Sequence, residues 1–126
     1  MKDIKILVVD DVDSMRKVTM SILMVAEYTN VTQATDGVEA LKLLQDELFD
    51  LIICDWEMPN MDGLELLIEI KKDERLKDIP LLMLTSNTEK AKVNVAINAG
   101  ASDYIIKPIQ PSVLLEKISN CLSETP

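Results

Sequence analysis

Histidine is absent from this 126-residue sequence, and glycine, cysteine and aromatic residues are scarce. Without histidine, the chain lacks the commonest general base, the Ser/His and Cys/His nucleophile pairs and the imidazole ligands of zinc. Cys54 lies in an apolar run and Cys121 near the C-terminal end, without the spacing of a metal site. We expect both to be small buried hydrophobic residues. Any chemistry is therefore expected to be carboxylate chemistry.

Basic charge and long apolar runs are also limited. There are 13 Lys and Arg against 22 Asp and Glu, and the net charge is -9. The basic residues form no stripe, which makes nucleic acid and anionic membranes poor partners. No apolar run approaches the roughly 20 residues of a membrane span, and no signal-peptide core follows Met1. We therefore expect a cytoplasmic protein without membrane insertion, and one domain over residues 1–126, because this length supports a single core.

The most informative stretch is residues 49–63, FDLIICDWEMPNMDG. Its apolar run, residues 51–54, is typical of a strand buried on both faces of a parallel sheet covered by helices. The run ends at Asp55, and open α/β sheets bind ligands outside the carboxyl ends of their strands. Asp55 is therefore a candidate functional residue. Trp56 follows it, either as a reporter of binding or as a partly exposed loop aromatic.

Strand and helix patterns alternate along the whole chain. Strands are expected at residues 4–9, 30–35, 51–54, 81–84 and 103–106. Helices are expected from Asp13 or Ser14 to about Tyr28, after Gly37, after Gly63, at 88–98 and from about Pro111. This alternation predicts an α/β fold, a doubly wound (βα)5 three-layer sandwich with a parallel sheet. The polar second strand suits a sheet edge, which is compatible with strand order 2-1-3-4-5.

Helical spacing also predicts which face of each helix is buried. The expected buried rows are Met15, Val18, Ile22 and Val25 in the first helix, Val38, Leu41 and Leu44 in the second, Leu64, Leu67 and Ile68 in the third, and Leu114, Ile118 and Cys121 in the last.

Four of the expected strands end in functional groups rather than in generic turn residues: Asp10 and Asp11, Asp55, Thr85, and Lys107. Carboxylates held close together raise each other's pKa unless a cation compensates. Magnesium suits this purpose, because it binds a few carboxylates plus waters and leaves positions for a phosphoryl oxygen. Lys107 adds a point charge and Thr85 a hydroxyl donor. Together these groups predict a site for phosphoryl transfer, with Asp55 as the nucleophile that forms an acyl phosphate.

This pattern resembles the receiver domain of bacterial response regulators over essentially the whole chain. The matching segments are VVDD at 8–11, DWEMPNMDG at 55–63, LTS at 84–86, AGASDY at 99–104 and KP at 107–108. The resemblance implies a flavodoxin-like fold with strand order 2-1-3-4-5. It also implies that Asp55 accepts a phosphoryl group from a histidine kinase, so that the protein is a switch and not an enzyme.

The resemblance further implies roles for the residues around Asp55. Magnesium would be bound by Asp10, Asp11, Asp55 and the main-chain carbonyl of Glu57. The phosphoryl group would be contacted or sensed by Thr85, Tyr104 and Lys107. Tyr104 would turn inward as Thr85 moves. The Lys107-Pro108 peptide bond is expected to be cis, as in the family.

Among receiver domains, the chain looks most like the stand-alone regulators of chemotaxis. It has no DNA-binding or catalytic output segment, and residues 13–16, DSMR, follow the acid pair. The output would then be a surface of a monomeric protein that docks on the flagellar motor switch protein. That face would be built by the fourth helix, fifth strand and fifth helix and would include Lys90, Val93, Ala101, Tyr104 and Lys117.

Other functions remain open on the same residues. A receiver that acts as a phosphorelay intermediate or a phosphate sink would use the same site. A magnesium-dependent phosphatase of the haloacid dehalogenase type would match residues 11–13, DVD, but Met15 stands where Thr or Val is expected and a cap domain has no room. A flavin carrier would need a Ser/Thr/Gly-rich loop where Asp10 and Asp11 stand.

Overall fold

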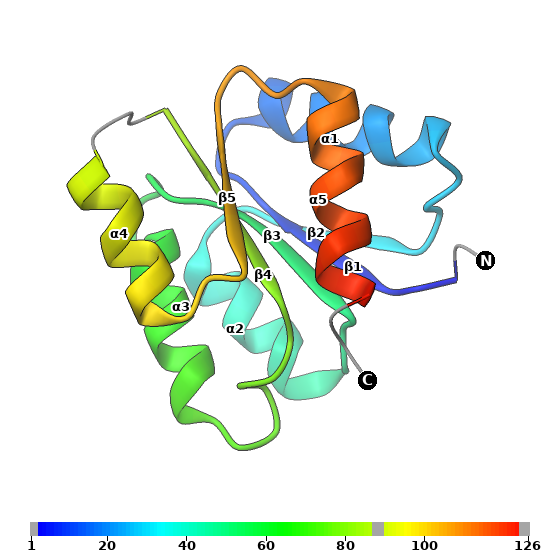
Figure 1. Ribbon diagram of the computed structural model, residues 1–126. Coiled ribbons are helices and arrows are strands. Elements are labelled where there is room, and N and C mark those ends of the chain that lie inside the picture. The colour runs from blue at the N-terminus through cyan, green and yellow to red at the C-terminus, as the bar shows by residue number, and fades with distance from the viewer. Residues whose placement is uncertain (1–2, 87–89, 124–126) are drawn as a thin grey trace.

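The computed structural model describes residues 3–86 and 90–123, without the side chain of Lys90. Strands and helices alternate along this part of the chain (Figure 1): β1 (Ile6–Val9), α1 (Asp13–Val25), β2 (Val31–Ala34), α2 (Gly37–Asp46), β3 (Leu51–Asp55), α3 (Gly63–Lys72), β4 (Leu81–Thr85), α4 (Lys90–Ala99), β5 (Asp103–Ile106) and α5 (Pro111–Ser123). The strands are parallel and neighbour one another in the order β2-β1-β3-β4-β5. The predicted fold class and strand order are confirmed.

Helices cover both faces of the sheet, so the domain has three layers. Figure 1 shows α1 and α5 on one face and α2, α3 and α4 on the other. Every residue of β1, β3 and β4 is buried, whereas the edge strands β2 and β5 contain partly exposed residues. Central strands with apolar side chains on both faces can be satisfied only between two helical layers. This burial explains the unbroken apolar runs in the sequence.

The last helix and the two cysteines are placed as the sequence predicts. Leu114, Ile118 and Cys121 are the buried residues of α5, and Cys54 is buried in β3. The Lys107-Pro108 peptide bond is cis. Gly100 follows α4 with a φ of 110°, in the left-handed region that glycine adopts without strain. The expected helix start at residue 88 lies outside the described residues.

The predicted buried faces of α1, α2 and α3 are wrong in part. Val25 is 87% exposed in α1, where Thr19 and Leu23 are buried instead. Val38 is exposed in α2, and Ile68 is 41% exposed in α3. Apolar residues occupy more than one stripe of each helix, so spacing alone allows neighbouring stripes. Packing against the twisted sheet selects one of them, which in α3 contains Leu66, Leu67 and Ile70.

The predicted start and end of α1 are also corrected. Val12 is the N-cap residue and makes no side-chain hydrogen bond to the helix, so neither Asp13 nor Ser14 is the cap. The helix ends at Val25 rather than near Tyr28, and Glu27 follows with a left-handed φ of 69°. No helix among the described residues is long and apolar enough to cross a bilayer.

Two isoleucines of α3 test the corrected face. We expect Ile70→Ala to lower the free energy of unfolding by about 2–5 kcal/mol, because it leaves a cavity in the core. We expect Ile68→Ala to cost less than about 1 kcal/mol, because that side chain is already 41% exposed and alanine favours helix. Urea unfolding of both variants measures the difference. Equal losses would contradict this orientation of α3.

Candidate functional site

The carboxyl ends of four neighbouring strands meet at one edge of the sheet. Main-chain hydrogen bonds continue past the strands there: the Asp10 amide donates to the Ala34 carbonyl at 3.1 Å, the Trp56 amide to Leu84 at 2.9 Å, and the Lys107 amide to Thr85 at 2.8 Å. The backbone at the strand ends is therefore as fixed as the sheet itself. The structure brings the four predicted strand ends together.

Three carboxylates form a compact group at this edge. Asp10, Asp11 and Asp55 each offer a carboxylate oxygen, and these oxygens lie within 4.8 Å of one another. Asp10 and Asp55 are buried, whereas Asp11 is exposed to solvent. Such a set of hard oxygen donors, open on one side, fits Mg²⁺, which retains waters when it binds a protein.

Asp10 provides a further observation in favour of a cation. Its Oδ1 atom accepts a hydrogen bond from the Val12 amide at 3.0 Å. Its Oδ2 atom is buried and accepts no hydrogen bond from the residues that the structure describes. A buried carboxylate oxygen without a partner is costly, and a bound cation would satisfy it. The residues present therefore fit a divalent metal ion.

Lys107 faces the same acids from the other side. Its Nζ atom lies 2.9 Å from Asp55 Oδ1, and both side chains are largely buried. Burial raises the pKa of Asp55, the hydrogen bond and charge of Lys107 lower it, and the charges of Asp10 and Asp11 raise it again, with a net shift upward. The hydrogen bond and charge of Lys107 thus do not offset the effect of burial on the pKa of Asp55.

Arg16 supports the loop between β1 and α1, a role that was not predicted from the sequence. Its guanidinium donates to the Asp10 carbonyl at 2.8 Å, to Asp13 Oδ1 at 2.6 Å and to Gln33 Oε1 at 2.8 Å. One side chain thereby ties the end of β1 to the first turn of α1 and to β2. Its position in the first helical turn after the acid pair was the only signal in the sequence.

The remaining predicted residues lie at different depths around this edge. Thr85 is buried at the end of β4. Tyr104 lies opposite Met83 in the sheet register, below the strand end, and its partly buried ring packs against the core on the side of α2, α3 and α4. The carboxylate of Glu57 is not part of the acid group, and its Oε1 atom accepts a hydrogen bond from the Ser86 hydroxyl at 3.4 Å.

Trp56 is only 6% exposed, so its interpretation as a partly exposed loop aromatic is wrong. The Nζ atom of Lys92 in α4 lies 5.5 Å from the centroid of its ring, within the range of a cation–π contact. Trp56 is thus a packed residue that connects the end of β3 to α4.

A parallel sheet of this order, with an acid pair, a buried aspartate and a lysine at its carboxyl edge, defines a receiver domain of two-component signalling. The family profile described as response regulator receiver domain matches residues 6–119, and the chain belongs to this family. Membership makes it a signalling protein rather than an enzyme of the phosphatase type considered above, and it likewise sets the flavin carrier aside.

Individual relatives include chemotaxis proteins. The chain is 41% identical to the chemotaxis protein CheY of Pseudomonas aeruginosa over 114 residues, which cover 90% of this chain and 92% of that protein. It resembles the structure of a putative response regulator from Chloroflexus aurantiacus with a TM-score of 0.92 and 34% identity, over 97% and 99% of the two chains. The receiver domain of a sensor histidine kinase from Pseudomonas aeruginosa, with a magnesium ion coordinated in its active site cleft, has a TM-score of 0.88 and 26% identity, over 96% and 98%.

The raised pKa of Asp55 predicts how the variant Asp55→Asn unfolds. The pKa of Asp55 is raised above its ordinary value of 3.8 in the folded state, so the folded state binds this proton more tightly than the unfolded state does. Ionisation of Asp55 as the pH rises therefore lowers the free energy of unfolding. In metal-free buffer at pH 7, we expect Asp55→Asn to be more stable than the wild type. The difference should shrink as the pH falls toward 4, where Asp55 takes up its proton.

Urea unfolding at several pH values measures this difference. The exposed Asp46 at the end of α2 provides the control Asp46→Asn, which removes the same charge away from the acid group. A gap for Asp55→Asn that does not change with pH, or a less stable variant at pH 7, would contradict the prediction.

Proposed function

We propose that this protein is a phosphorylation-activated switch in which Asp55 accepts a phosphoryl group from a histidine kinase in the presence of Mg²⁺. The observation that carries the proposal is the buried Asp55 carboxylate, paired with Lys107 at 2.9 Å and grouped with Asp10 and Asp11 within 4.8 Å. The magnesium ion in the receiver domain of a Pseudomonas aeruginosa sensor kinase supports the metal.

The chain's own residues determine how the transfer proceeds. A carboxylate oxygen of Asp55 attacks the phosphorus in line, and the bond from phosphorus to the kinase imidazole breaks, with its electron pair returning to that nitrogen. The product is an acyl phosphate on Asp55. Because the Asp55 carboxylate is almost fully buried, it has lost most of its hydrating water before the attack.

Separate groups would hold the metal and the phosphoryl group. The side chains of Asp10, Asp11 and Asp55, with the Glu57 carbonyl, would bind Mg²⁺, which neutralises charge on the phosphoryl oxygens when it is bound. Lys107 would move from its ion pair with Asp55 to a phosphoryl oxygen, and the Thr85 hydroxyl would donate a second hydrogen bond. Each of these residues stands at or just after a strand end, so the acceptor is positioned before the donor arrives.

The change at Asp55 would reach a partner through β4 and β5. The Thr85 carbonyl accepts the Lys107 amide hydrogen bond and Thr85 lies opposite Ile106 in the register, so a movement of Thr85 is passed to β5. We propose that Tyr104 then turns inward. Its ring lies beside the Lys117 ammonium group at 5.6 Å from the centroid, and Lys117 is paired with Asp103 at 2.9 Å.

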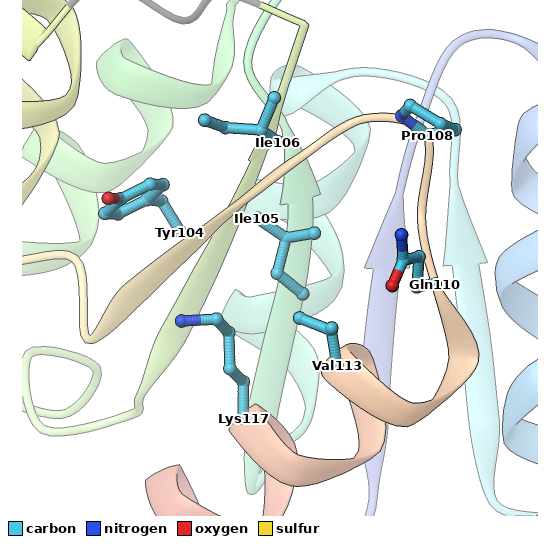
Figure 2. A pocket seen from close by; sticks show the side chains of 7 residues that line it. All are labelled: Tyr104, Ile105, Ile106, Pro108, Gln110, Val113 and Lys117. Carbon is cyan, nitrogen blue, oxygen red and sulfur yellow. The ribbon is translucent and has the colours of Figure 1, made fainter.

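The proposed partner face is built by α4, β5 and α5. A hollow of about 270 Å³ lies beside β5 and α5. Figure 2 shows the side chains that line it: Tyr104, Ile105, Ile106, Pro108, Gln110, Val113 and Lys117. Of the residues expected on this face, Val93 and Ala101 are buried, Tyr104 and Lys117 are partly exposed, and the side chain of Lys90 lies outside the described residues. Because the relative from Pseudomonas aeruginosa is a chemotaxis protein, we propose the flagellar motor switch protein as the partner.

The domain organisation, oligomeric state and cellular location are part of the same proposal. We propose that residues 1–126 act as one receiver domain that is monomeric and cytoplasmic. A phosphorelay intermediate would use the same acceptor and would pass the phosphoryl group to another histidine, whereas a phosphate sink would lose it to water. Three measurements on the phosphorylated chain distinguish these functions: binding to the motor switch protein, transfer of the label to a histidine phosphotransfer protein, and release of inorganic phosphate.

Intact mass spectrometry with acetyl phosphate tests the acceptor. We expect one phosphoryl adduct on the wild type that requires Mg²⁺, is stable in acid and is lost in base, as an acyl phosphate should be. Asp55→Asn should give no adduct, because an amide is not a nucleophile, while retaining the fold as a near isostere. An adduct of equal yield on Asp55→Asn would show that another residue is the acceptor.

Thermal unfolding tests the metal. Because a ligand of the folded state stabilises it by mass action, we expect millimolar Mg²⁺ to raise Tm. Asp10→Asn should raise Tm in metal-free buffer by relieving repulsion and should reduce the response to Mg²⁺. An unchanged Tm of the wild type at millimolar Mg²⁺ would count against a metal site at Asp10, Asp11 and Asp55.

A further inference from the structure

The loop between β3 and α3, residues 56–62, is closed at its base by two main-chain hydrogen bonds, of which one is to the sheet. The Trp56 amide donates to the Leu84 carbonyl at 2.9 Å, and the Gly63 amide donates to the Trp56 carbonyl at 2.8 Å. These two contacts close the base of the loop. They leave its far part, residues 58–61, to be held by contacts with another element.

That element is the N-terminus of α2. The Asn60 side-chain amide donates to Asp36 Oδ2 at 2.7 Å, and the Gly37 amide donates to the Met61 carbonyl at 3.1 Å. Asp36 is also the N-cap of α2, since its Oδ1 atom accepts the Glu39 amide at 2.8 Å. One carboxylate therefore serves a helix cap with one oxygen and the site loop with the other.

The local backbone is adapted to this contact on both sides. Asn60 has a φ of 69°, in the left-handed region that asparagine tolerates better than most residues. At Gly37, a Cβ atom would lie 2.6 Å from the Met61 carbonyl oxygen, so only glycine allows the approach. The hydrogen bonds from the Glu39 amide and from Asn60 lower the pKa of Asp36, which keeps it an ionised acceptor.

Asn60 lies three residues after Glu57, and the segment between them is stiff. Pro59 fixes its own φ and restricts Met58 before it, and the Met61 amide closes a tight turn onto the Pro59 carbonyl at 2.7 Å. A stiff connection of this length transmits the position of Asn60 to the main chain of Glu57.

We propose that the Asp36–Asn60 hydrogen bond is a positioning contact that holds the β3–α3 loop so that the Glu57 main chain faces the metal site. The proposal rests on the function proposed above. Asp36 and Asn60 touch neither the metal nor the phosphoryl group, and they act through the loop. Removing either partner leaves the three aspartates in place and weakens Mg²⁺ binding, because the loop then samples other positions.

Two variants remove the contact and keep the local backbone. Asn60→Gly retains the left-handed conformation, and Asp36→Ser retains a good N-cap residue that is too short to reach Asn60. Calorimetric titration with MgCl₂ measures the affinity of each variant and of the double variant. We expect each single variant to bind about three- to tenfold more weakly, at or below the lower end of losses caused by removing groups bonded directly to metal ligands.

The double variant separates this role from general destabilisation. If one contact is responsible, the double variant should bind Mg²⁺ no more weakly than either single variant. The single variant Asp36→Asn should retain nearly the wild-type affinity for Mg²⁺, because it keeps the cap and can pair with a reoriented Asn60 amide. Asp73→Ala, which removes the acceptor of the Arg75 amide at the far end of α3, controls for an equal loss of stability without loss of affinity.

The outcomes distinguish the two proposals. A wild type that binds no Mg²⁺ would overturn the proposed function and the positioning contact together. A wild type that binds Mg²⁺ while Asn60→Gly binds it equally well would overturn only the positioning contact. Asn60→Gly alone decides this point if Asp36→Ser does not fold, because Asn60 is exposed and its removal leaves the core unchanged.

Discussion

The burial of two carboxylates at the end of an apolar sheet is the interaction on which the rest of the site depends. Asp10 and Asp55 are almost fully buried and continue strands whose other residues are apolar. An ionised carboxylate in such a place costs free energy unless charges or hydrogen bonds compensate. Lys107 compensates from the end of β5 and the Val12 amide from the loop after β1. The proposed cation would be the third compensating group.

The edge strand β2 and the start of α2 support the site without contributing a ligand. Gln33 accepts the hydrogen bond of Arg16, which fixes the loop after β1, and Asp36 accepts that of Asn60 in the loop after β3. The loops that follow the acid-bearing strands β1 and β3 are therefore both tied to the same edge of the sheet. In this arrangement the polar character of β2 serves the geometry of the site and is not only a consequence of an exposed edge.

The opposite edge connects the site to the proposed partner face. Lys107 follows β5 directly, and its amide donates to Thr85 at the end of β4. Tyr104 and Lys117 then join β5 to α5 through the contact between ammonium group and ring. In the proposed function, a change at Asp55 that draws Lys107 or Thr85 toward a phosphoryl group would act on β5, the strand that carries Tyr104. The β2 edge would then support the site, and the β5 edge would respond to phosphorylation.

The sequence by itself determined the strands, their burial and the functional groups at their ends. In a parallel sheet the carboxyl ends of the strands lie at the same edge, so residues at the ends of neighbouring strands lie close together. The positions of Asp10, Asp55, Thr85 and Lys107 at or next to the strand ends can be predicted for this reason from the residue pattern alone, and their roles stay predictions. Tertiary structure decided the buried stripes of α1, α2 and α3, because several apolar stripes were equally compatible with helical spacing. It also decided the contacts of Arg16 with Gln33 and of Asn60 with Asp36, which join residues 17 and 24 positions apart. Polar side chains at such separations can pair in many ways, and only the packed loops bring one pairing within hydrogen-bond distance.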